Sequence, residues 1–386
     1  MKTKDQNYPA FLFAGRLQRD YLLPEQGRPQ VDIPGGGLLY AAAGLGVWEA
    51  DEKVGLLARA GEDYPEEWLR WFKSHGWDTR GIHVLAEALD LRYFEAREGG
   101  DASAAGGSDT EIASLPLQSS RSTLRPYDSE IASLPTVARN DRGHKGIARS
   151  NPVAHYARLG LPFPKSLLGY QMEEEVEGGR KGVHPAAPRP GDIPADYLQA
   201  RAAHVCPLDY LSACSLSSTL RRAGVSTLTL DPTAAYMSVR RQEEVRVLLQ
   251  GLTAFLPSEE ELRGLFWGQT DDLWEIAEAL GDFGCEYVVV KCGALGTRLF
   301  DAVSRKRWEV PAYPARAADP HGAGDSFCGG FLAGYQRTFD PLQGALQGCV
   351  SASLTIEGSG VFHALEALPG LAQRRLDSLR GLVREV

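Results

Sequence analysis

Short apolar strands alternate with helices along the second half of the chain, and this alternation constrains the fold more than any other feature. Strand–helix–strand units of this length form a parallel sheet that is covered by helices on both faces. The sequence therefore predicts an α/β sandwich. The expected elements are a strand at 203–206, a helix at 215–223, a strand at 226–230, a helix at 243–250, a strand at 254–256, a helix at 271–280 and a strand at 287–290.

The first half shows the same alternation of strands and helices over a shorter stretch. Strands are expected at 11–14, 54–58 and 91–96, and a helix at 65–75. We therefore divide the chain into an N-terminal part at 1–98, an insertion at 99–192 and a C-terminal part at 193–386. The insertion is rich in Gly, Ser, Asp and Pro and has little periodicity, so we expect it to be partly flexible. It contains one duplicated hexapeptide, Glu-Ile-Ala-Ser-Leu-Pro, at 111–116 and 130–135.

Charge and cysteine usage exclude several classes of function. The net charge of −9 comes with scattered Lys and Arg, which argues against a nucleic-acid or anionic-membrane surface. The six cysteines form no C-x-x-C pair, which fits a reduced, cytoplasmic setting. No apolar run approaches the roughly 20 residues that a membrane span requires.

The segment from Asp319 to Phe327, Asp-Pro-His-Gly-Ala-Gly-Asp-Ser-Phe, carries the clearest chemistry. Gly322, Ala323 and Gly324 precede a helix of small residues, so their amides can converge at its positive end and bind phosphate oxygens. Asp325 at the helix start can accept the proton of an attacking hydroxyl. The plainer reading, a helix N-cap, is disfavoured because Asp319 and the small-residue helix flank the turn.

This segment resembles the C-terminal signature of the ribokinase/PfkB family of carbohydrate kinases, Asp-Thr-x-Gly-Ala-Gly-Asp-x-Phe. The resemblance implies a three-layer α/β/α sandwich with a mostly parallel sheet and a small β-lid. It also implies that Asp325 is the catalytic base and that Gly322, Ala323 and Gly324 form the anion hole. Pro320 replaces the usual Thr, which can alter the local turn and a cation site.

The N-terminal half carries the acceptor side of the same resemblance. Gly35, Gly36 and Gly37 are similar to the family's di-glycine motif, which opens a helix and holds the substrate. Tyr40 stands where the family usually has an Asn that touches the sugar. Asp20 resembles the aspartate that binds acceptor hydroxyls. Alone, each of these could be a turn or a surface residue.

The C-terminal half carries the nucleotide side. Lys291, Gly293 and Gly296 resemble the motif Thr/Lys-x-Gly-x-x-Gly, although a hairpin turn would give the same pattern; Asp319 is also assigned to the cofactor. Glu261 resembles the glutamate that positions Mg²⁺, with Ser258 in place of Asn; a Ser-capped helix start explains the same residues. The resemblance thus implies ATP and Mg²⁺, and admits a monovalent cation.

These residues predict a carbohydrate kinase that phosphorylates an alcohol group of a small sugar-like acceptor with ATP. The acceptor stays open among a sugar, sugar acid, sugar phosphate and nucleoside; Arg16, Arg19 and Arg59 could reach an anion. The alternative is a catalytically silent nucleotide or sugar sensor, motivated by the replaced positions. A dinucleotide oxidoreductase is disfavoured because no G-x-G-x-x-G follows a strand.

Three further expectations stay open at the level of sequence. Asp231 follows a strand, where it could lie near the metal or be structural. Residues 162–170 could extend the lid, contact a second subunit or form a surface insertion. A homodimer is consistent with the resemblance, since the lid in this family often mediates dimers.

Overall fold

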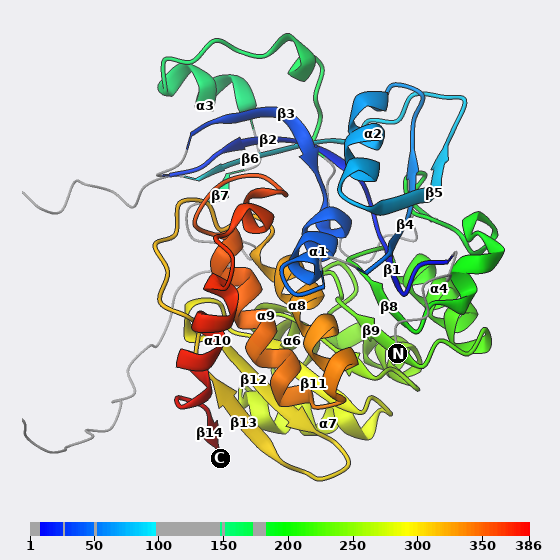
Figure 1. Ribbon diagram of the computed structural model, residues 1–386, viewed down its shortest axis with the longest axis vertical. Helices are drawn as coiled ribbons and strands as arrows, with labels where there is room; N and C mark the ends of the chain where they lie inside the picture. The colour runs from blue at the N-terminus through cyan, green and yellow to red at the C-terminus, as the bar shows by residue number, and fades with distance from the viewer. Residues whose placement is uncertain (1–7, 26–27, 50–51, 98–146, 149–150, 173–182) are drawn as a thin grey trace, which may run out of the picture.

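The computed structural model describes residues 8–25, 28–49, 52–97, 147–148, 151–172 and 183–386. The two hexapeptide copies and most of the expected insertion lie outside these ranges. Within them, ten strands form one sheet in the order β14-β13-β12-β11-β10-β9-β8-β1-β4-β5 (Figure 1). The strands are β1 Phe11–Ala14, β4 Val54–Ala60, β5 Trp77–Val84, β8 Ala202–Val205, β9 Thr227–Leu230, β10 Ala254–Phe255, β11 Tyr287–Lys291, β12 Thr297–Asp301, β13 Arg307–Val310 and β14 Arg384–Glu385.

The central sheet is mostly parallel, as expected. Every neighbouring pair from β5 through β11 is parallel, and β12, β13 and β14 add antiparallel strands at one edge. Strands β12 and β13 pair as an antiparallel hairpin at this edge. Parallel strands need crossover connections, and helices supply them here.

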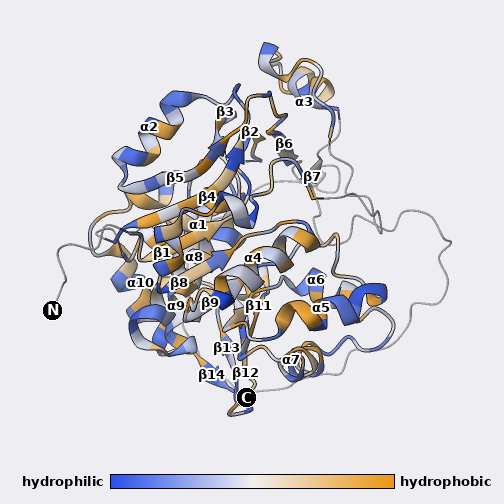
Figure 2. Ribbon diagram, turned by 90° about the vertical axis from the view of Figure 1, so that its right-hand side faces the viewer, coloured by the Kyte–Doolittle hydropathy of each residue, from blue (hydrophilic) through white to orange (hydrophobic). Residues whose placement is uncertain are grey.

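Helices cover both faces of the sheet, which confirms the three-layer sandwich (Figure 2). Side chains of β1 alternate between the two cores: Phe11 and Phe13 face one, whereas Leu12 and Ala14 face the other. Helices α1, α8, α9 and α10 lie on the first side and α4, α5 and α7 on the second. The helices are α1 Gly37–Gly46, α2 Glu66–Ser74, α3 Pro152–Arg158, α4 Tyr210–Arg222, α5 Gln242–Leu249, α6 Glu259–Leu265, α7 Leu273–Asp282, α8 Ala323–Thr338, α9 Pro341–Thr355 and α10 Leu371–Arg380.

A second sheet forms the lid, with the order β3-β2-β6-β7 among the described strands. These strands are β2 Gln18–Leu23, β3 Gln30–Gly35, β6 Arg92–Arg97 and β7 Ile147–Ala148. Alternation along β2 and β6 gives the lid two different faces. Tyr21 and Phe94 belong to a small apolar core, whereas Asp20 and Glu95, their neighbours in sequence, both contact His321. The lid predicted from the family resemblance is therefore present.

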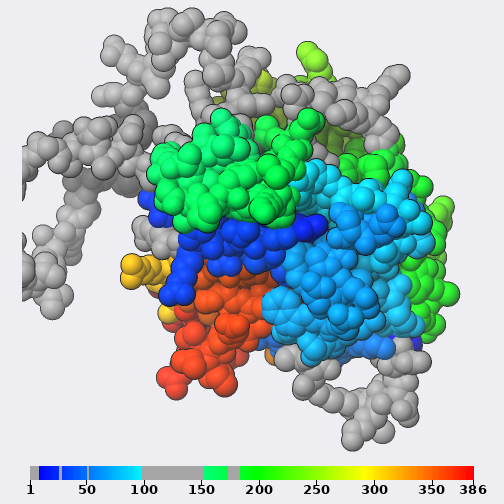
Figure 3. Space-filling view, turned by 90° about the horizontal axis from the view of Figure 1, so that it is seen from above, coloured from blue at the N-terminus to red at the C-terminus, as the bar shows by residue number. Residues whose placement is uncertain are grey.

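The chain covers the apolar face of its own lid. Tyr156 of α3 and Leu167 are buried against Tyr21 and Phe94. Seen from above, the segment 151–172 (green) lies over the lid strands (blue) in Figure 3. Of the alternatives for residues 162–170, the lid extension is the one that this packing supports.

No helix within the described ranges combines the length and the apolar character needed to cross a membrane.

Candidate active site

The candidate site lies where the parallel strands end, which is the usual ligand position in open α/β sheets. Asp231 follows β9, Ser258 follows β10 and Lys291 ends β11. Ser258 and Lys291 form an isolated parallel bridge, so the backbone holds them side by side. Residues that are far apart in sequence therefore meet at the carboxyl ends of the parallel strands, and this is the edge of the sheet meant below.

Two helix N-termini meet at this edge. Gly36 caps α1 with φ 100° and Gly322 caps α8 with φ 73°, and both angles favour glycine. The first turns approach so closely that a β-carbon on Gly37 would overlap Oδ1 of Asp325. Further along, a β-carbon on Gly44 would overlap the carbonyl oxygen of Ser326. Backbone contact between α1 and α8 thus fixes the position of Asp325.

Asp325 has the surroundings expected of a catalytic base. It lies in the first turn of α8, where a helix presents amides that have no acceptor within the helix. Burial raises the pKa of its carboxyl to about 6, and the Asp231 carboxylate adds to the shift while Lys291 and His321 oppose it. A carboxylate with that pKa accepts a proton more readily than an exposed aspartate and is still ionised at neutral pH.

Lys291 places a positive charge beneath the turn that precedes α8. Its ammonium lies 2.5 Å from Oδ2 of Asp231, and a β-carbon on Gly324 would be 3.5 Å from it. Burial alone would lower the pKa of Lys291, but the Asp231 carboxylate more than offsets this and raises the pKa above its ordinary value. The expected proximity of Lys291 to the anion hole is therefore present. Asp231 is its charge partner.

Gly293 and Gly296 form the turn between β11 and β12, so the hairpin alternative describes their backbone correctly. Gly293 lies in open space, whereas a β-carbon on Gly296 would overlap the carbonyl oxygen of Val310. Gly293 is thus open to a ligand and Gly296 is packed inside the hairpin. Their assignment to the nucleotide stays a prediction.

Glu261 caps its own helix, as the alternative reading expected. Its Oε2 accepts hydrogen bonds from the backbone amide of Ser258 at 2.7 Å and from the Ser258 hydroxyl at 2.8 Å. Burial, and then the nearby Asp231, raise the pKa of Glu261 to about 7. Among the described residues, no group of three or more His, Cys, Asp or Glu side chains is arranged as a metal cage. The donor set fits an ion held mainly by phosphate oxygens and water, which is the usual coordination of Mg²⁺.

On the acceptor side, Asp20 projects from β2 into the space left by Gly35. The carboxylate is fully buried, and a β-carbon on Gly35 would overlap it. Its Oδ2 lies 3.2 Å from Nε2 of His321. Nδ1 of the same imidazole lies 3.2 Å from Oε2 of Glu95 on β6. His321 therefore connects the lid strands β2 and β6 to the turn before α8.

Tyr40 and Asp319 shape the same turn. The Tyr40 ring lies edge-on to His321 with 5.3 Å between ring centroids, and a β-carbon on Gly322 would overlap that ring. Asp319 is buried, and its Oδ1 accepts a 3.1 Å hydrogen bond from the His321 amide. In the structure Asp319 thus organises the turn; its contact with a cofactor remains a prediction.

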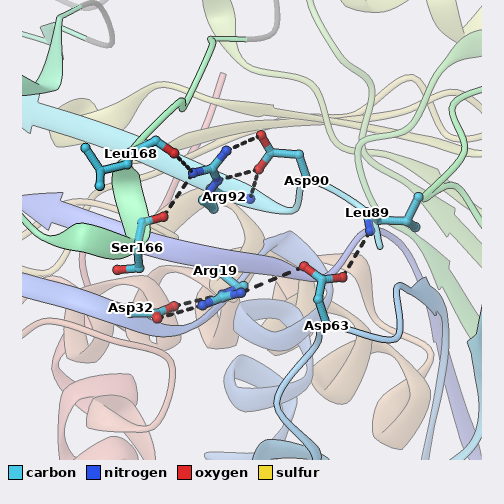
Figure 4. A network of polar contacts seen from close by, with 8 residues as sticks. All are labelled: Arg19, Asp32, Asp63, Leu89, Asp90, Arg92, Ser166 and Leu168. Atoms are coloured by element: carbon cyan, nitrogen blue, oxygen red, sulfur yellow. Dashed lines mark hydrogen bonds and ion pairs between the residues drawn. The ribbon is translucent and has the colours of Figure 1, made fainter. Parts of the chain in front are cut away.

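Two arginines proposed as anion ligands are already paired. Arg19 donates two hydrogen bonds to Asp32, at 2.8 and 2.7 Å, and lies 3.9 Å from Asp63 (Figure 4). Arg59 makes a similar two-pronged pair with Asp192 at 2.6 and 2.9 Å. Neighbouring carboxylates therefore hold the guanidiniums of Arg19 and Arg59, and a contact of either with an acceptor's phosphate or carboxylate stays a prediction.

Sequence reasoning missed two residues of this site. Glu95 and Tyr93 lie on one face of β6, and the Tyr93 hydroxyl donates a 2.8 Å hydrogen bond to Glu95. The Tyr93 ring also lies 5.3 Å from that of His321. Alternation in the strand expected at 91–96 would have put Tyr93 and Glu95 on the same face. It could not have revealed that this face meets His321.

Comparisons with known proteins find a family match and a curated relative. Residues 194–368 match the family model described as pfkB family carbohydrate kinase. A cytidine kinase from Thermococcus kodakarensis is 24% identical over 326 residues, which cover 84% of this chain and 87% of that protein.

Solved structures show the same fold at low sequence identity. An Escherichia coli protein assigned as ribokinase II, crystallised with ATP and Mg²⁺, has a TM-score of 0.62 and 14% identity over 97% of this chain and 99% of that chain. A Methanocaldococcus jannaschii nucleoside kinase, described as an archaeal member of the ribokinase family, has a TM-score of 0.58 and 15% identity over 96% and 98%. Both similarities span nearly the whole of each chain.

Proposed function

Because residues 194–368 match the family model described as pfkB family carbohydrate kinase, we propose that the chain belongs to this family and transfers the γ-phosphoryl group of ATP to an alcohol group of a sugar-like or nucleoside acceptor. The observation that carries the proposal is the position of Asp325, which lies at the start of α8 and faces the start of α1. A base at that place receives a proton from a hydroxyl, while the neighbouring amides stabilise negative charge on the phosphoryl oxygens.

Each part of the site has a role in this reaction. Asp20 and the Gly35–Gly37 turn, together with Tyr40, hold the acceptor. Asp325 takes the proton of its hydroxyl as that oxygen attacks phosphorus. The amides of Gly322, Ala323 and Gly324 at the N-terminus of α8 stabilise the charge on the transferring phosphoryl oxygens.

The nucleotide lies on the other side of this turn. Lys291 adds positive charge beneath the phosphates, and the hairpin with Gly293 and Gly296, together with Asp319, borders the nucleotide. Mg²⁺, when bound, would supply positive charge that neutralises the phosphate oxygens. Glu261 would hold that ion through water with its Oε1, because its Oε2 accepts the hydrogen bonds that cap α6.

The relatives support two acceptor classes. Because one relative is a cytidine kinase and one structural neighbour is a nucleoside kinase, nucleosides stand beside sugars in the proposal. An ATP-consumption screen over nucleosides and sugars, with product identified by mass spectrometry, tests it. We expect at least one acceptor to be phosphorylated by the wild type.

The same screen with Asp325→Asn tests the assigned base. Loss of a central catalytic group should lower kcat by about 10³-fold or more. ATP binding, measured by calorimetry, should change little because the amides remain in place. Retained ATP binding with no phosphate transfer to any acceptor by the wild type would instead support the silent sensor.

A further inference from the structure

Strands β2 and β3 of the lid pair antiparallel, and their register slips at one place. Asp20 lies opposite Ile33, but the next residue of β2, Tyr21, lies opposite Val31. Asp32 is therefore an extra residue on β3, and it forms a β-bulge, called the lid bulge below. Its φ of 55° lies in the left-handed region, which residues other than glycine seldom adopt.

The lid bulge lies directly beside Asp20, which holds the acceptor in the proposed reaction. A bulge bends its strand and changes the direction of nearby side chains, and bulges are frequent next to active sites. After the bulge, β3 runs to Gly35, where an added β-carbon would overlap the Asp20 carboxylate, and the chain then enters α1. The register at Asp32 therefore determines how Asp20 lies over the start of α1.

An ion pair holds the lid bulge in place. Nε of Arg19 donates to Oδ1 of Asp32 at 2.8 Å, and Nη2 donates to Oδ2 at 2.7 Å. Nη1 lies 3.9 Å from the carboxylate of Asp63, which accepts a 3.0 Å hydrogen bond from the amide of Leu89 (Figure 4). Asp63 lies in the loop after β4, so one guanidinium joins β2, β3 and the main sheet.

The ion pair and the Asp20 carboxylate lie on opposite faces of the lid. Side chains alternate along a strand, so Arg19 points to the face of Tyr21, whereas Asp20 points to His321 at the site. Arg19 and Asp32 therefore act on Asp20 through the backbone. Without the pair, the left-handed conformation of Asp32 loses its side-chain support, and a shift of one residue in register would move side chains of β3 to the other face.

We propose that Arg19 and Asp32 are positioning residues, which hold the lid bulge so that the Asp20 carboxylate stays over Gly35 at the start of α1. This inference rests on the proposed kinase function and adds to it two side chains that do not meet the acceptor. It gives Arg19 a role other than contact with an anionic acceptor, and the two roles predict different results.

Arg19→Met removes the ion pair and keeps a long side chain. We expect kcat/KM for an acceptor that the wild type phosphorylates to fall about 10-fold or more, because small misplacements of a binding group have large effects, while the KM of ATP stays within about threefold. Arg80→Met, which removes a two-pronged pair with Asp78 on β5, is the matched control and should change neither value. If Arg19→Met lowers thermal stability but leaves kcat/KM for the acceptor unchanged, the pair is merely structural and the inference is overturned.

Two substitutions of Asp32 separate its backbone conformation from the bulk of its side chain. Asn tolerates the left-handed region and still accepts a hydrogen bond from Arg19, so Asp32→Asn should stay within about threefold of the wild type. Val is β-branched and accepts no hydrogen bond, so Asp32→Val should lower kcat/KM for the acceptor at least as much as Arg19→Met. Equal values in the two Asp32 variants would overturn the role of the lid bulge.

Removal of Asp20 separates positioning from direct contact. In an Asp20→Ala background, adding Arg19→Met should change the affinity for the acceptor, measured by calorimetry, by less than about twofold, because Arg19 acts through Asp20. A further loss in that background, larger for a sugar phosphate than for the free sugar, would show that Arg19 contacts the acceptor itself and would overturn the inference.

The proposed function and this inference fail differently. Transfer by the wild type with equal acceptor kinetics in Arg19→Met keeps the kinase and removes the positioning role. Absence of transfer by the wild type to every acceptor removes the kinase. Calorimetry of the same sugars and nucleosides on wild type and Arg19→Met then decides whether the pair supports binding: weaker binding to the variant supports it, and equal binding overturns it.

Discussion

Asp325 and Gly37 face each other across the first turns of α8 and α1, so closely that a β-carbon on the glycine would overlap Oδ1 of the carboxylate. The carboxylate that we propose as the base is therefore positioned by the absence of a side chain on a neighbouring helix. This relationship leads to the first prediction.

Gly37→Ala should displace Asp325 and lower kcat by about 100-fold, since small misplacements of a catalytic group have effects of that size. ATP binding should survive because the amides of α8 remain. Steady-state kinetics and calorimetry check both statements. Gly381→Ala, where an added β-carbon meets nothing within 4 Å, is the control and should behave as wild type. Wild-type kcat in Gly37→Ala would contradict the assigned position of the base.

The pKa of Asp325 predicts how activity depends on pH. A base works only when deprotonated, and the pKa of Asp325 is raised to about 6. We therefore expect kcat to be level above pH 7 and to fall about 10-fold per pH unit below pH 6. Glu261→Gln separates this acidic fall in kcat from the titration of Glu261, whose pKa is raised to about 7. The fall in kcat should persist in that variant. If it disappears, it belongs to the titration of Glu261.

Much of the sandwich could be predicted from local pattern, and the reason is physical. Strands such as β1 and β11 are buried and read as continuous apolar runs. Strands β2 and β3 were not foreseen, because one face of the lid carries polar residues toward the site and their sequences, Gln18–Leu23 and Gln30–Gly35, do not look like strands. Helix α4 begins at Tyr210, earlier than the expected 215, because Asp209 caps it.

The site was partly predictable for a related reason. Gly322–Asp325 is local, so its sequence reveals a helix start with an acidic first turn. The pair of His321 with Glu95 joins positions 226 residues apart, and no spacing rule connects them. Such pairs follow only from the placement of the lid over the sheet.

Lys291 and Asp231 form a buried ion pair whose loss should affect stability and binding separately. Lys291→Met leaves the Asp231 carboxylate buried without its partner, so the free energy of unfolding should fall by about 3–5 kcal/mol. Adding Asp231→Asn should restore part of that loss, because the uncompensated charge is gone. Affinity for ATP should remain reduced in both variants. Urea denaturation and calorimetry measure the two effects; full recovery of ATP affinity in the double variant would argue against a phosphate role for Lys291.

Arg92 holds the cover of the lid in place. Its guanidinium donates to the carbonyl oxygens of Ser166 and Leu168, both at 2.9 Å, while Asp90 pairs with it from the other side (Figure 4). Arg92→Met should speed amide hydrogen exchange across 152–170 because two carbonyl contacts are lost. The exchange rates of α8 should not change. Arg70→Met, which removes an exposed pair with Glu66, serves as control and should leave residues 152–170 unaffected.

The contact between α1 and α8 is made largely of main-chain atoms, with Gly44 against the carbonyl of Ser326 and Gly329 against that of Ala41. The side chains of Tyr40 and His321, on the proposed acceptor side, lie beside this main-chain contact. Under the proposed function, substitutions at such positions can change which acceptor binds while the contact between α1 and α8 keeps Asp325 in place. Redesign for a new acceptor should accordingly begin at these side chains and leave the crossing of the two helices untouched.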